Sequence, residues 1–211
     1  MKYESVIFDL DGTLVHSLPE HRYTLVGKVL REFGVKGTDE DIDRFWFEGC
    51  RDKIVTDSFG VPLENFWHVY KKYDTIGLRE KLTKPYTDVD FIQEIKKAGL
   101  KVGIVTGAPL HIAALEIDML GKDNFDAIVV AHRLNGFMPK PHPQGLEECL
   151  SLMGISNDKS MYVGNADEDI TTAKNAQVFD VLIDRKEHVF SELNPSLTIY
   201  SLYDLRKFLE I

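Results

Sequence analysis

The sequence predicts an α/β protein, built on a parallel sheet with helices on both faces, that carries an all-helical insert. Short apolar runs rich in β-branched residues alternate with helical patterns over most of the chain, and this alternation is typical of a parallel sheet. Between residues 16 and 85 the strand-like runs stop and only helical patterns remain. We therefore predict a sheet-containing core of residues 1–15 and 86–211 and a helical domain of residues 16–85.

Five apolar runs predict the strands, and they occupy residues 5–8, 101–105, 126–130, 161–164 and 181–183. Each run is short and lacks polar alternation, which is the pattern of a strand buried on both faces. We expect these strands to form the centre of the molecule, covered by the helices that separate them.

Five helical patterns belong to the core, at residues 89–99, 109–120, 143–154, 167–176 and 201–211. Gly99 is expected just beyond the first of them, where the chain adopts a left-handed conformation. Pro109 is expected at the first position of the second, where a missing N–H costs no hydrogen bond. The last pattern is predicted to close the chain as an amphipathic helix.

The insert contains four helical patterns, at residues 19–34, 38–49, 51–60 and 63–77. Thr38, with Asp41 three residues later, resembles a capping box and predicts a helix start. Aromatic residues recur at helical spacing and are expected to pack the insert onto itself; they are Phe45, Trp46, Phe47, Phe66, Trp67 and Tyr70. Lys84-Pro85 predicts the end of the insert, because a residue before proline disfavours helix.

Composition narrows the class of protein. The chain has 211 residues, 44% of them hydrophobic, which is enough for a buried core. Its net charge of −9 argues against nucleic acid as a partner, because such binding needs a basic surface. Cys50 and Cys149 show neither metal-ligand nor disulfide spacing and suit a reducing compartment. Because no apolar run approaches the roughly 18 residues of a membrane span and the start is acidic, we expect a cytoplasmic protein without a membrane partner.

Polar residues follow three of the predicted strands directly. The carboxyl ends of parallel strands lie at one edge of a sheet, so we expect these residues to meet. Several carboxylates there would repel one another unless a divalent cation relieved them, and oxygen ligands of this kind select Mg²⁺. The residues are Asp9 and Asp11 after the first strand, Thr106 and Gly107 after the second, and Asn165, Asp167 and Asp169 after the fourth.

The same edge is expected to bind an anion. Lys140 lies in MPKPHP, where prolines are predicted to hold the backbone extended and to present the ammonium group. The Thr106 hydroxyl and the backbone N–H groups of the glycine-containing turns at Gly12 and Gly107 would add further donors. The anion that fits this set most simply is a phosphoryl group.

Asp9 and Asp11 are expected to have different roles. A carboxylate beside Mg²⁺ and in line with phosphorus can act as a nucleophile and form an aspartyl phosphate, and we assign this role to Asp9. Two residues later in an extended stretch, Asp11 can lie on the same side of the chain. It can protonate the leaving oxygen and then take a proton from the attacking water.

Four motifs, FDLDGTL, IVTG, KPHP and VGNADEDI, occur in this order and resemble those of the haloacid-dehalogenase-like phosphatases over essentially the whole chain. The resemblance implies a Rossmann-like core, Mg²⁺ dependence and a covalent aspartyl phosphate. Asp9 then matches the family nucleophile and Asp11 the acid/base residue. Thr106 matches the hydroxyl that binds the phosphoryl group, and Lys140 matches the motif lysine. The family's dehalogenases lack an equivalent of Asp11 and its P-type ATPases carry threonine there, so the aspartate favours phosphate-ester hydrolysis.

The fourth motif departs from the family pattern VGDSxxDI. Asn165 stands in place of the first aspartate, and Asp169 matches the second. An amide oxygen can still bind Mg²⁺, but with less charge and therefore more weakly. Asp167 has no family match and is interpreted as a helix N-cap; His16 and Gln177 are two smaller departures. The predicted metal ligands are thus Asp9, Asp11 and Asp169, followed by Asn165.

The insert resembles the small helical cap that many of these enzymes place after the first motif, where it closes over the core and contacts the substrate. GCRDKI at residues 49–54 resembles the cap substrate loop. This resemblance makes Arg51 a candidate ligand for a second anionic group; the alternative is a solvated arginine, or one paired with Asp52. His21 stands where relatives of the β-phosphoglucomutase type have a cap-side histidine; the alternative is a surface histidine or one satisfied in the core.

We therefore predict a Mg²⁺-dependent phosphomonoester hydrolase that acts on a small phosphorylated metabolite, of the phosphoglycolate or sugar phosphate type. One alternative is a β-phosphoglucomutase-like phosphomutase, which returns the phosphoryl group to a sugar. A second is a non-catalytic phosphate-binding module, impaired at Asn165. Retention of Asp9, Asp11, Thr106 and Lys140 argues against that second alternative. Neither the individual substrate nor the oligomeric state follows from these residues.

Overall fold

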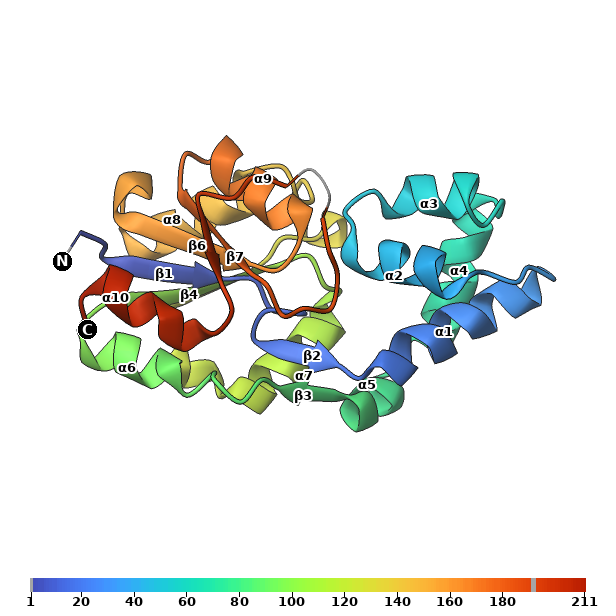
Figure 1. The fold of residues 1–211 in the computed structure, drawn as a ribbon, viewed down its shortest axis with the longest axis horizontal. Helices are drawn as coiled ribbons and strands as arrows, with labels where there is room; N and C mark the ends of the chain where they lie inside the picture. The colour runs from blue at the N-terminus through green and yellow to red at the C-terminus, as the bar shows by residue number, and fades with distance from the viewer. Residues whose placement is uncertain (1, 191–192) are drawn as a thin grey trace. The chain divides into compact units, whose positions relative to one another are not determined.

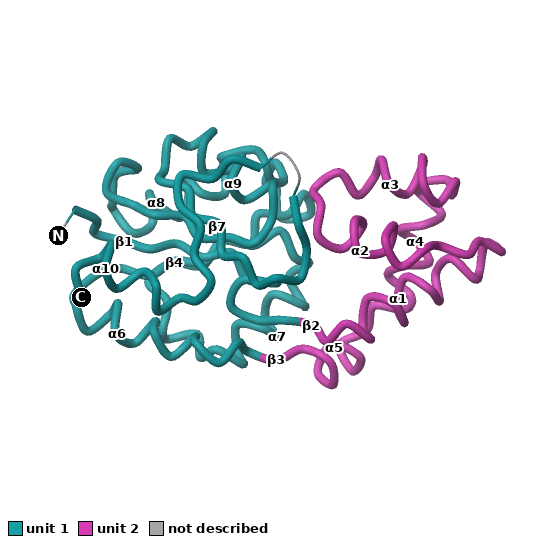
Figure 2. The backbone as a smooth tube through the Cα atoms, viewed as in Figure 1, with its two compact units in different colours: residues 1–16, 85–211 teal, residues 17–84 magenta. Residues whose placement is uncertain are grey.

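The computed structural model describes residues 2–190 and 193–211. The chain divides into two compact units, which Figure 2 distinguishes by colour. Unit 1 comprises residues 1–16 and 85–211, and unit 2 comprises residues 17–84. Each of the two boundaries differs by one residue from the one expected from the sequence.

Unit 1 is built on a six-stranded sheet in the order β5-β4-β1-β6-β7-β8, and every neighbouring pair in it is parallel. Figure 1 shows β1 at the centre, beside β4 and β6. The five predicted strands are confirmed as β1 (Ser5–Phe8), β4 (Lys101–Thr106), β5 (Ala127–Val130), β6 (Ser160–Gly164) and β7 (Phe179–Ile183). The edge strand β8 (Leu197–Ile199) was not predicted, because three residues carry little pattern.

Helices cover both faces of this sheet, as predicted. One core cluster joins the sheet to α6 (Phe91–Lys97), α7 (Leu110–Leu120) and α10 (Arg206–Leu209). The other joins it to α8 (Gln144–Met153) and α9 (Asp167–Asn175). Short 3-10 helices span Lys122–Asn124, Arg133–Asn135, Asn157–Lys159 and Leu202–Leu205. The predicted α/β fold class, a Rossmann-like parallel sheet, is therefore confirmed.

Helix ends in unit 1 confirm some predictions and correct others. Gly99 follows α6 with a φ of +83°, as expected. Pro109 is the N-cap of α7, one position before the predicted one. The predicted helix at residues 201–211 is instead a 3-10 turn followed by the four-residue α10. Ser201 is the N-cap of this turn, and its hydroxyl oxygen accepts from the backbone N–H of Tyr203 at 3.3 Å.

Unit 2 contains five helices among its described residues: α1 (Pro19–Glu32), α2 (Asp39–Phe47), α3 (Arg51–Asp57), α4 (Leu63–Tyr73) and α5 (Ile76–Leu82). Thr38 caps α2 as predicted, since its hydroxyl oxygen accepts from the backbone N–H of Asp41 at 3.1 Å. The aromatic packing is also confirmed, because the Phe45 ring lies 5.3 Å from Phe66 and 5.8 Å from Trp67. α5 was not predicted.

The prediction that residues 16–85 hold only helices is wrong at both ends of the insert. β2 (Val15–Ser17) and β3 (Thr83–Pro85) pair with each other in a two-stranded sheet. These strands lie where the chain passes between the units. Three-residue strands cannot be recognised from periodicity, which needs a longer window.

Gly103 marks a close approach between β4 and α8. A Cβ at this position would lie 2.6 Å from the Cys149 Sγ and 3.3 Å from the Ile7 side chain. We expect Gly103→Ala to lower the free energy of unfolding by about 1–3 kcal/mol, because the core has no room for the methyl group. Urea unfolding measures this loss. Adding Cys149→Ala should recover most of it, and a double variant as unstable as the sum of the two single variants would contradict the packing argument.

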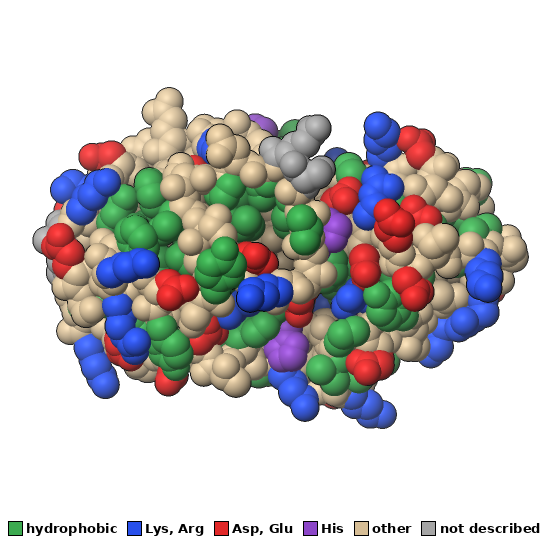
Figure 3. Space-filling view, in the orientation of Figure 1, with side chains coloured by type: hydrophobic (Ala, Val, Ile, Leu, Met, Phe, Trp, Pro, Cys, Tyr) green, Lys and Arg blue, Asp and Glu red, His purple; other side chains and the backbone are tan. Residues whose placement is uncertain are grey.

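The surface of the molecule mixes charges of both signs. Figure 3 shows Lys and Arg interspersed with Asp and Glu on the face in view, in a chain whose net charge is −9. Cys50 is exposed and Cys149 is buried, both as free thiols. Within residues 2–190 and 193–211, no helix has the length and apolar character needed to cross a membrane.

Candidate active site

The carboxyl ends of β1, β4 and β6 bring the predicted site residues to one edge of the sheet. Phe8, the last residue of β1, is in register with Ile104 on one side and Val163 on the other. Asp9 follows β1, Thr106 ends β4 and Asn165 follows β6. These three loops therefore meet, as the parallel topology predicts.

Lys140 joins two carboxylates at this edge. Its Nζ donates to the Asp9 Oδ1 at 2.6 Å and to the Asp169 Oδ1 at 2.7 Å. All three side chains are buried, and Lys140 is only 4% exposed. The ammonium group also lies 5.4 Å above the ring of Tyr162. A buried cation with two charged partners is held tightly, because charge-assisted hydrogen bonds strengthen out of water.

Burial and charge perturb the protonation of this cluster. Burial, together with the charge of Asp169, raises the pKa of Asp9 to about 7, although Lys140 acts in the opposite direction. Burial alone would lower the pKa of Lys140, but the charges of Asp169 and Asp9 raise it well above its usual value. The cluster thus holds a firmly protonated lysine between two acids. Such perturbed groups in one place are typical of functional sites.

Both carboxylate oxygens of Asp169 accept hydrogen bonds. Its Oδ1 accepts from the Tyr162 hydroxyl at 3.1 Å as well as from Lys140, and its Oδ2 accepts from the Ala166 backbone N–H at 3.1 Å. Its carboxyl group packs against Gly164, where a Cβ would lie 2.3 Å away. Bulkier residues are therefore excluded at position 164, and Asp169 is an anchoring group within the site.

Asp167 does not cap α9, contrary to the prediction. It is the first residue of that helix, and the N-cap is Ala166. The Asp167 Oδ1 accepts from the backbone N–H of Glu168 at 2.8 Å. The N-terminal turn is held instead by Asp169, which lies at the third helical position and accepts from the Ala166 N–H.

Thr13 connects Asp9 with Asn165. Its buried hydroxyl lies 3.4 Å from the Asp9 Oδ2 and 3.3 Å from the Asn165 Oδ1. Gly12 precedes it with a φ of +77°, and a Cβ there would lie 2.2 Å from the Asn165 amide nitrogen. The Gly12 N–H donates to the Val15 carbonyl at 2.6 Å. This N–H is therefore bonded within the turn itself.

Asp11 lies after β1 has ended, so the expected extended stretch does not continue through it. Its backbone forms an isolated bridge to Val15, within the turn that follows the strand. The side chain is half-buried. Asp11 therefore follows a bend in the chain and not a continuous strand.

Thr106 ends β4 at the same edge, and Gly107 follows it. The buried Thr106 hydroxyl oxygen accepts from the Ala108 N–H at 3.1 Å, whereas Gly107 is exposed. Lys140, by contrast, does not lie in extended backbone as predicted. It lies in a turn closed by the bond from the His142 N–H to the Pro139 carbonyl at 3.0 Å, and this turn directs it inward.

The two candidate residues of the insert have contacts within unit 2. The exposed Arg51 begins α3 and its Nη2 donates to the Trp46 carbonyl at 3.3 Å. Its neighbour Asp52 accepts from the Trp67 ring nitrogen at 2.9 Å. His21 is fully buried in α1, 3.8 Å from Asp74 and edge-on to the Trp46 ring.

Sequence reasoning missed Tyr162 and gave Thr13 no role. Tyr162 is fully buried in β6. Its hydroxyl oxygen lies 3.1 Å from the Val105 carbonyl oxygen and 3.1 Å from the Asp169 Oδ1, and both are acceptors for its proton. A usable signal was present, because a tyrosine inside an apolar strand needs a partner for its hydroxyl. Thr13 was within the quoted first motif, but only the fold brings Asn165 against it.

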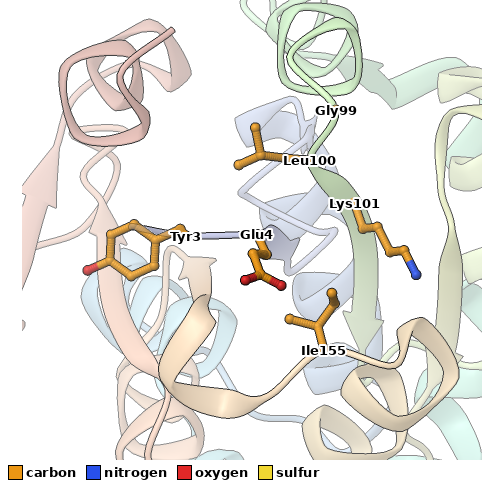
Figure 4. A pocket seen from close by; sticks show the side chains of 6 residues that line it. All are labelled: Tyr3, Glu4, Gly99, Leu100, Lys101 and Ile155. Carbon is orange, nitrogen blue, oxygen red and sulfur yellow. The ribbon is translucent and has the colours of Figure 1, made fainter. Parts of the chain in front are cut away.

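A pocket elsewhere in unit 1 does not coincide with this site. This pocket has a volume of about 290 Å³ and lies at the opposite end of the sheet, where β1 and β4 begin; Figure 4 shows the side chains that line it. It is lined by Tyr3, Glu4, Gly99, Leu100, Lys101 and Ile155. The converging carboxylates and Lys140 lie at the carboxyl ends of the strands, so the pocket has no part in the chemistry considered below.

Comparison with known proteins identifies the class. The model of the haloacid dehalogenase-like hydrolases matches residues 6–183, which include the whole cluster around Asp9 and Lys140. The chain belongs to the haloacid dehalogenase-like hydrolase family.

Individual relatives are similar over four fifths or more of their length. Pyrophosphatase PpaX of Halalkalibacterium halodurans is 27% identical over 97% of this chain and 96% of its own. Phosphoglycolate phosphatase of Aquifex aeolicus is 27% identical over 81% of this chain and 80% of its own. A crystal structure of a Bacteroides fragilis protein has a TM-score of 0.83 at 23% identity, covering 97% of this chain and 100% of that one. The prediction of a phosphatase is confirmed by these relatives, and the fold by the solved structure.

Proposed function

We propose that this protein is a Mg²⁺-dependent phosphomonoester hydrolase that works through an aspartyl phosphate on Asp9. The observation that carries the proposal is the Asp9 carboxylate, buried at the end of the central strand and held by Lys140 at 2.6 Å. A carboxylate fixed in this way can present an oxygen to phosphorus without a large loss of side-chain entropy.

The proposed reaction has two steps. In the first, an Asp9 oxygen attacks phosphorus, the bond from phosphorus to the ester oxygen breaks, and the Asp11 carboxyl group protonates the leaving alcohol. In the second, Asp11 takes a proton from water, the water oxygen attacks phosphorus, and the bond to Asp9 breaks to release phosphate. Lys140 keeps Asp9 oriented, and the Thr106 hydroxyl binds a phosphoryl oxygen.

The oxygen donors at the site suit Mg²⁺. Asp9 Oδ2 and Asn165 Oδ1 both face the Thr13 hydroxyl, and both are hard oxygen ligands. No three His, Cys, Asp or Glu side chains in the described ranges are arranged to hold a metal by themselves. The proposed side-chain ligands are therefore Asp9 and Asn165, and Asp11 keeps its acid/base role, whereas the carboxylate of Asp169 is already bound by Lys140, Tyr162 and Ala166. The cation would supply positive charge that keeps Asp9 ionised and stabilises the phosphoryl oxygens.

The proposed substrate is a small phosphorylated metabolite. The two relatives named above carry different substrates in their names, phosphoglycolate and pyrophosphate, at the same 27% identity. These names support a small phosphorylated compound as the substrate, but they do not indicate which compound. We propose unit 2 as the cap, with Arg51 as a ligand for a second anionic group. His21 is fully buried beside Asp74 and Trp46, so its contacts favour a structural role.

A phosphatase screen tests the proposal. The purified protein is incubated with a panel of phosphorylated metabolites and with p-nitrophenyl phosphate, each with Mg²⁺ and with EDTA. We expect that release of inorganic phosphate requires Mg²⁺ and does not require a bisphosphate activator. Turnover that requires a sugar bisphosphate would favour the phosphomutase instead. Binding of Mg²⁺ without turnover of any compound would favour the non-catalytic module.

Asn165 gives a separate prediction about the metal. Asn165→Asp is expected to raise Mg²⁺ affinity by about tenfold, because a second carboxylate adds charge to the ligand set. Isothermal titration calorimetry without substrate measures this affinity. Asn157→Asp, which adds the same charge just before β6 and thus at its opposite end, is the matched control and should leave the affinity unchanged. Equal affinities in all three proteins would place Asn165 outside the coordination sphere.

A further inference from the structure

Arg185 forms a dense set of contacts two residues beyond the end of β7. Its Nη1 donates to the Asp88 Oδ2 at 2.8 Å and its Nη2 to the Asp88 Oδ1 at 3.1 Å. The same Nη2 donates to the backbone carbonyl of Thr13 at 2.7 Å. The guanidinium group also lies 3.8 Å from the ring centre of Tyr86. The side chain is only 8% exposed.

Asp88 is in turn fixed by groups other than Arg185. Its Oδ2 accepts from the Ser201 hydroxyl at 2.9 Å and from the Leu202 backbone N–H at 2.8 Å. Burial alone would raise the pKa of Asp88, but these hydrogen bonds and that of Arg185 lower it below its usual value. Arg185 is therefore attached to a rigid carboxylate, and a bidentate pair of this kind orients the guanidinium plane.

The bond to Thr13 links this pair to the candidate active site. Thr13 places its hydroxyl between Asp9 and Asn165, at 3.4 and 3.3 Å. The turn that carries it is held by amide bonds from Leu14 and Val15 to the Leu10 carbonyl, at 2.9 and 3.1 Å. Arg185 thus binds the backbone of Thr13. The Thr13 side chain in turn contacts the proposed nucleophile, Asp9, and a proposed metal ligand, Asn165.

The same cluster also lies at the points where the chain leaves unit 1. The backbone N–H of Tyr86 donates to the Leu14 carbonyl at 3.0 Å, and the Tyr86 ring stacks on His16 at 4.7 Å. His16 and Pro85 are the residues of unit 1 next to the two boundaries. Arg185 therefore stacks on Tyr86. Tyr86 contacts the segment by which the chain leaves unit 1, and it lies one residue after Pro85, where the chain returns.

We propose that Arg185 is a positioning residue for the phosphatase site. By holding the Thr13 carbonyl, it fixes the turn of residues 10–15 and so keeps the Thr13 hydroxyl between Asp9 and Asn165. The effect of Arg185 on catalysis rests on the proposed function. Its effect on the order of the turn does not depend on that function. Lysine cannot replace arginine here, because one ammonium group cannot bind both Asp88 oxygens and the carbonyl in a single plane.

The first test measures the turn without any substrate. Amide hydrogen exchange is compared in the wild type, Arg185→Lys and Arg206→Lys. Arg206 is the matched control, since it also binds a carboxylate through two nitrogens, at 2.9 and 2.6 Å from Glu94, and stacks on Tyr203. We expect the Leu14 and Val15 amides to exchange at least about tenfold faster only in Arg185→Lys, because local opening becomes easier. Unchanged exchange at these amides would overturn the proposal.

The second test measures catalysis with p-nitrophenyl phosphate. Arg185→Lys is expected to lower kcat about tenfold while KM stays within about twofold, because orientation and not binding is lost. Combined with Thr13→Val, which removes the hydroxyl, Arg185→Lys should cause little further loss if it acts through Thr13. Losses that multiply in the double variant would overturn the proposal.

The two tests separate the possible failures. If the wild type hydrolyses nothing, the proposed function fails while the exchange experiment still decides whether Arg185 holds the turn. If Arg185→Lys does not fold, Asp88→Asn is measured in the same way, since it removes the charge that orients the guanidinium group. Faster exchange at Leu14 and Val15 in that variant supports the proposal, and unchanged exchange overturns it.

Discussion

Asp9→Asn is expected to reduce phosphate release by at least about a thousandfold while the protein stays folded. The amide has nearly the shape of the carboxylate, so the sheet edge keeps its packing. It lacks the negative charge that attacks phosphorus, and it cannot form the aspartyl phosphate. Steady-state kinetics with p-nitrophenyl phosphate measure the loss, and circular dichroism measures the fold.

Asp167→Asn is the matched control for Asp9→Asn. Asp167 follows β6 at the same edge, but its Oδ1 accepts from the adjacent Glu168 N–H and no role in the reaction is proposed for it. Activity within about twofold of the wild type is expected for this variant. Mass spectrometry of acid-quenched wild type should find the phosphoryl group on a peptide that contains Asp9. Near-normal activity in Asp9→Asn would remove this residue from the nucleophilic role.

Lys140→Met is expected to have the second largest effect, and it should affect both stability and activity. Removing the ammonium group leaves Asp9 and Asp169 buried and facing each other without a cation. Loss of one member of a buried ion pair costs about 3–5 kcal/mol. The pKa of Asp9 should rise above its present value of about 7, because Lys140 now lowers it. We expect kcat to fall at least about a hundredfold, because orientation and charge of the nucleophile are both lost.

A second substitution separates the two effects of Lys140→Met. Adding Asp169→Asn removes one of the two facing charges and should recover much of the lost free energy of unfolding, but not the activity. Lys101→Met is the matched control, since Lys101 donates to the Met153 carbonyl and pairs with neither acid. Urea unfolding and kinetics are measured for each variant. If the double variant is no more stable than Lys140→Met, repulsion between the acids is not the cause.

The strands of the sheet were predictable because they are long enough and apolar enough to be recognised. β1 is predicted at its observed bounds, and β4, β5, β6 and β7 within one or two residues at either end. The three-residue strands β2, β3 and β8 were missed, since pairing across the chain and not local pattern defines them. The C-terminal α-helix was overestimated, because apolar spacing over a few residues does not distinguish the 3-10 turn Leu202–Leu205 from an α-helix.

Some features of the candidate site were also predictable from the sequence, and others were not. Asp9, Thr106, Asn165 and Asp169 follow or end buried strands, so parallel topology alone brings them together. The extended backbone predicted at Lys140 is wrong, and the Gly12 N–H is bonded within its own turn. Both depend on hydrogen bonds formed with other residues of a turn, and composition does not reveal these bonds.

Local patterns in the sequence by themselves determined the α/β class, the central strands, the helical insert and the edge of the sheet where acidic residues collect. Short-range periodicity encodes these features, because each strand or helix must bury its own apolar face. Only the tertiary structure decided that Asp169 is held by Lys140 and Tyr162, and that Arg185 grips the Thr13 carbonyl. These contacts join residues far apart in the chain, and they exist only after the sheet has placed their strands side by side.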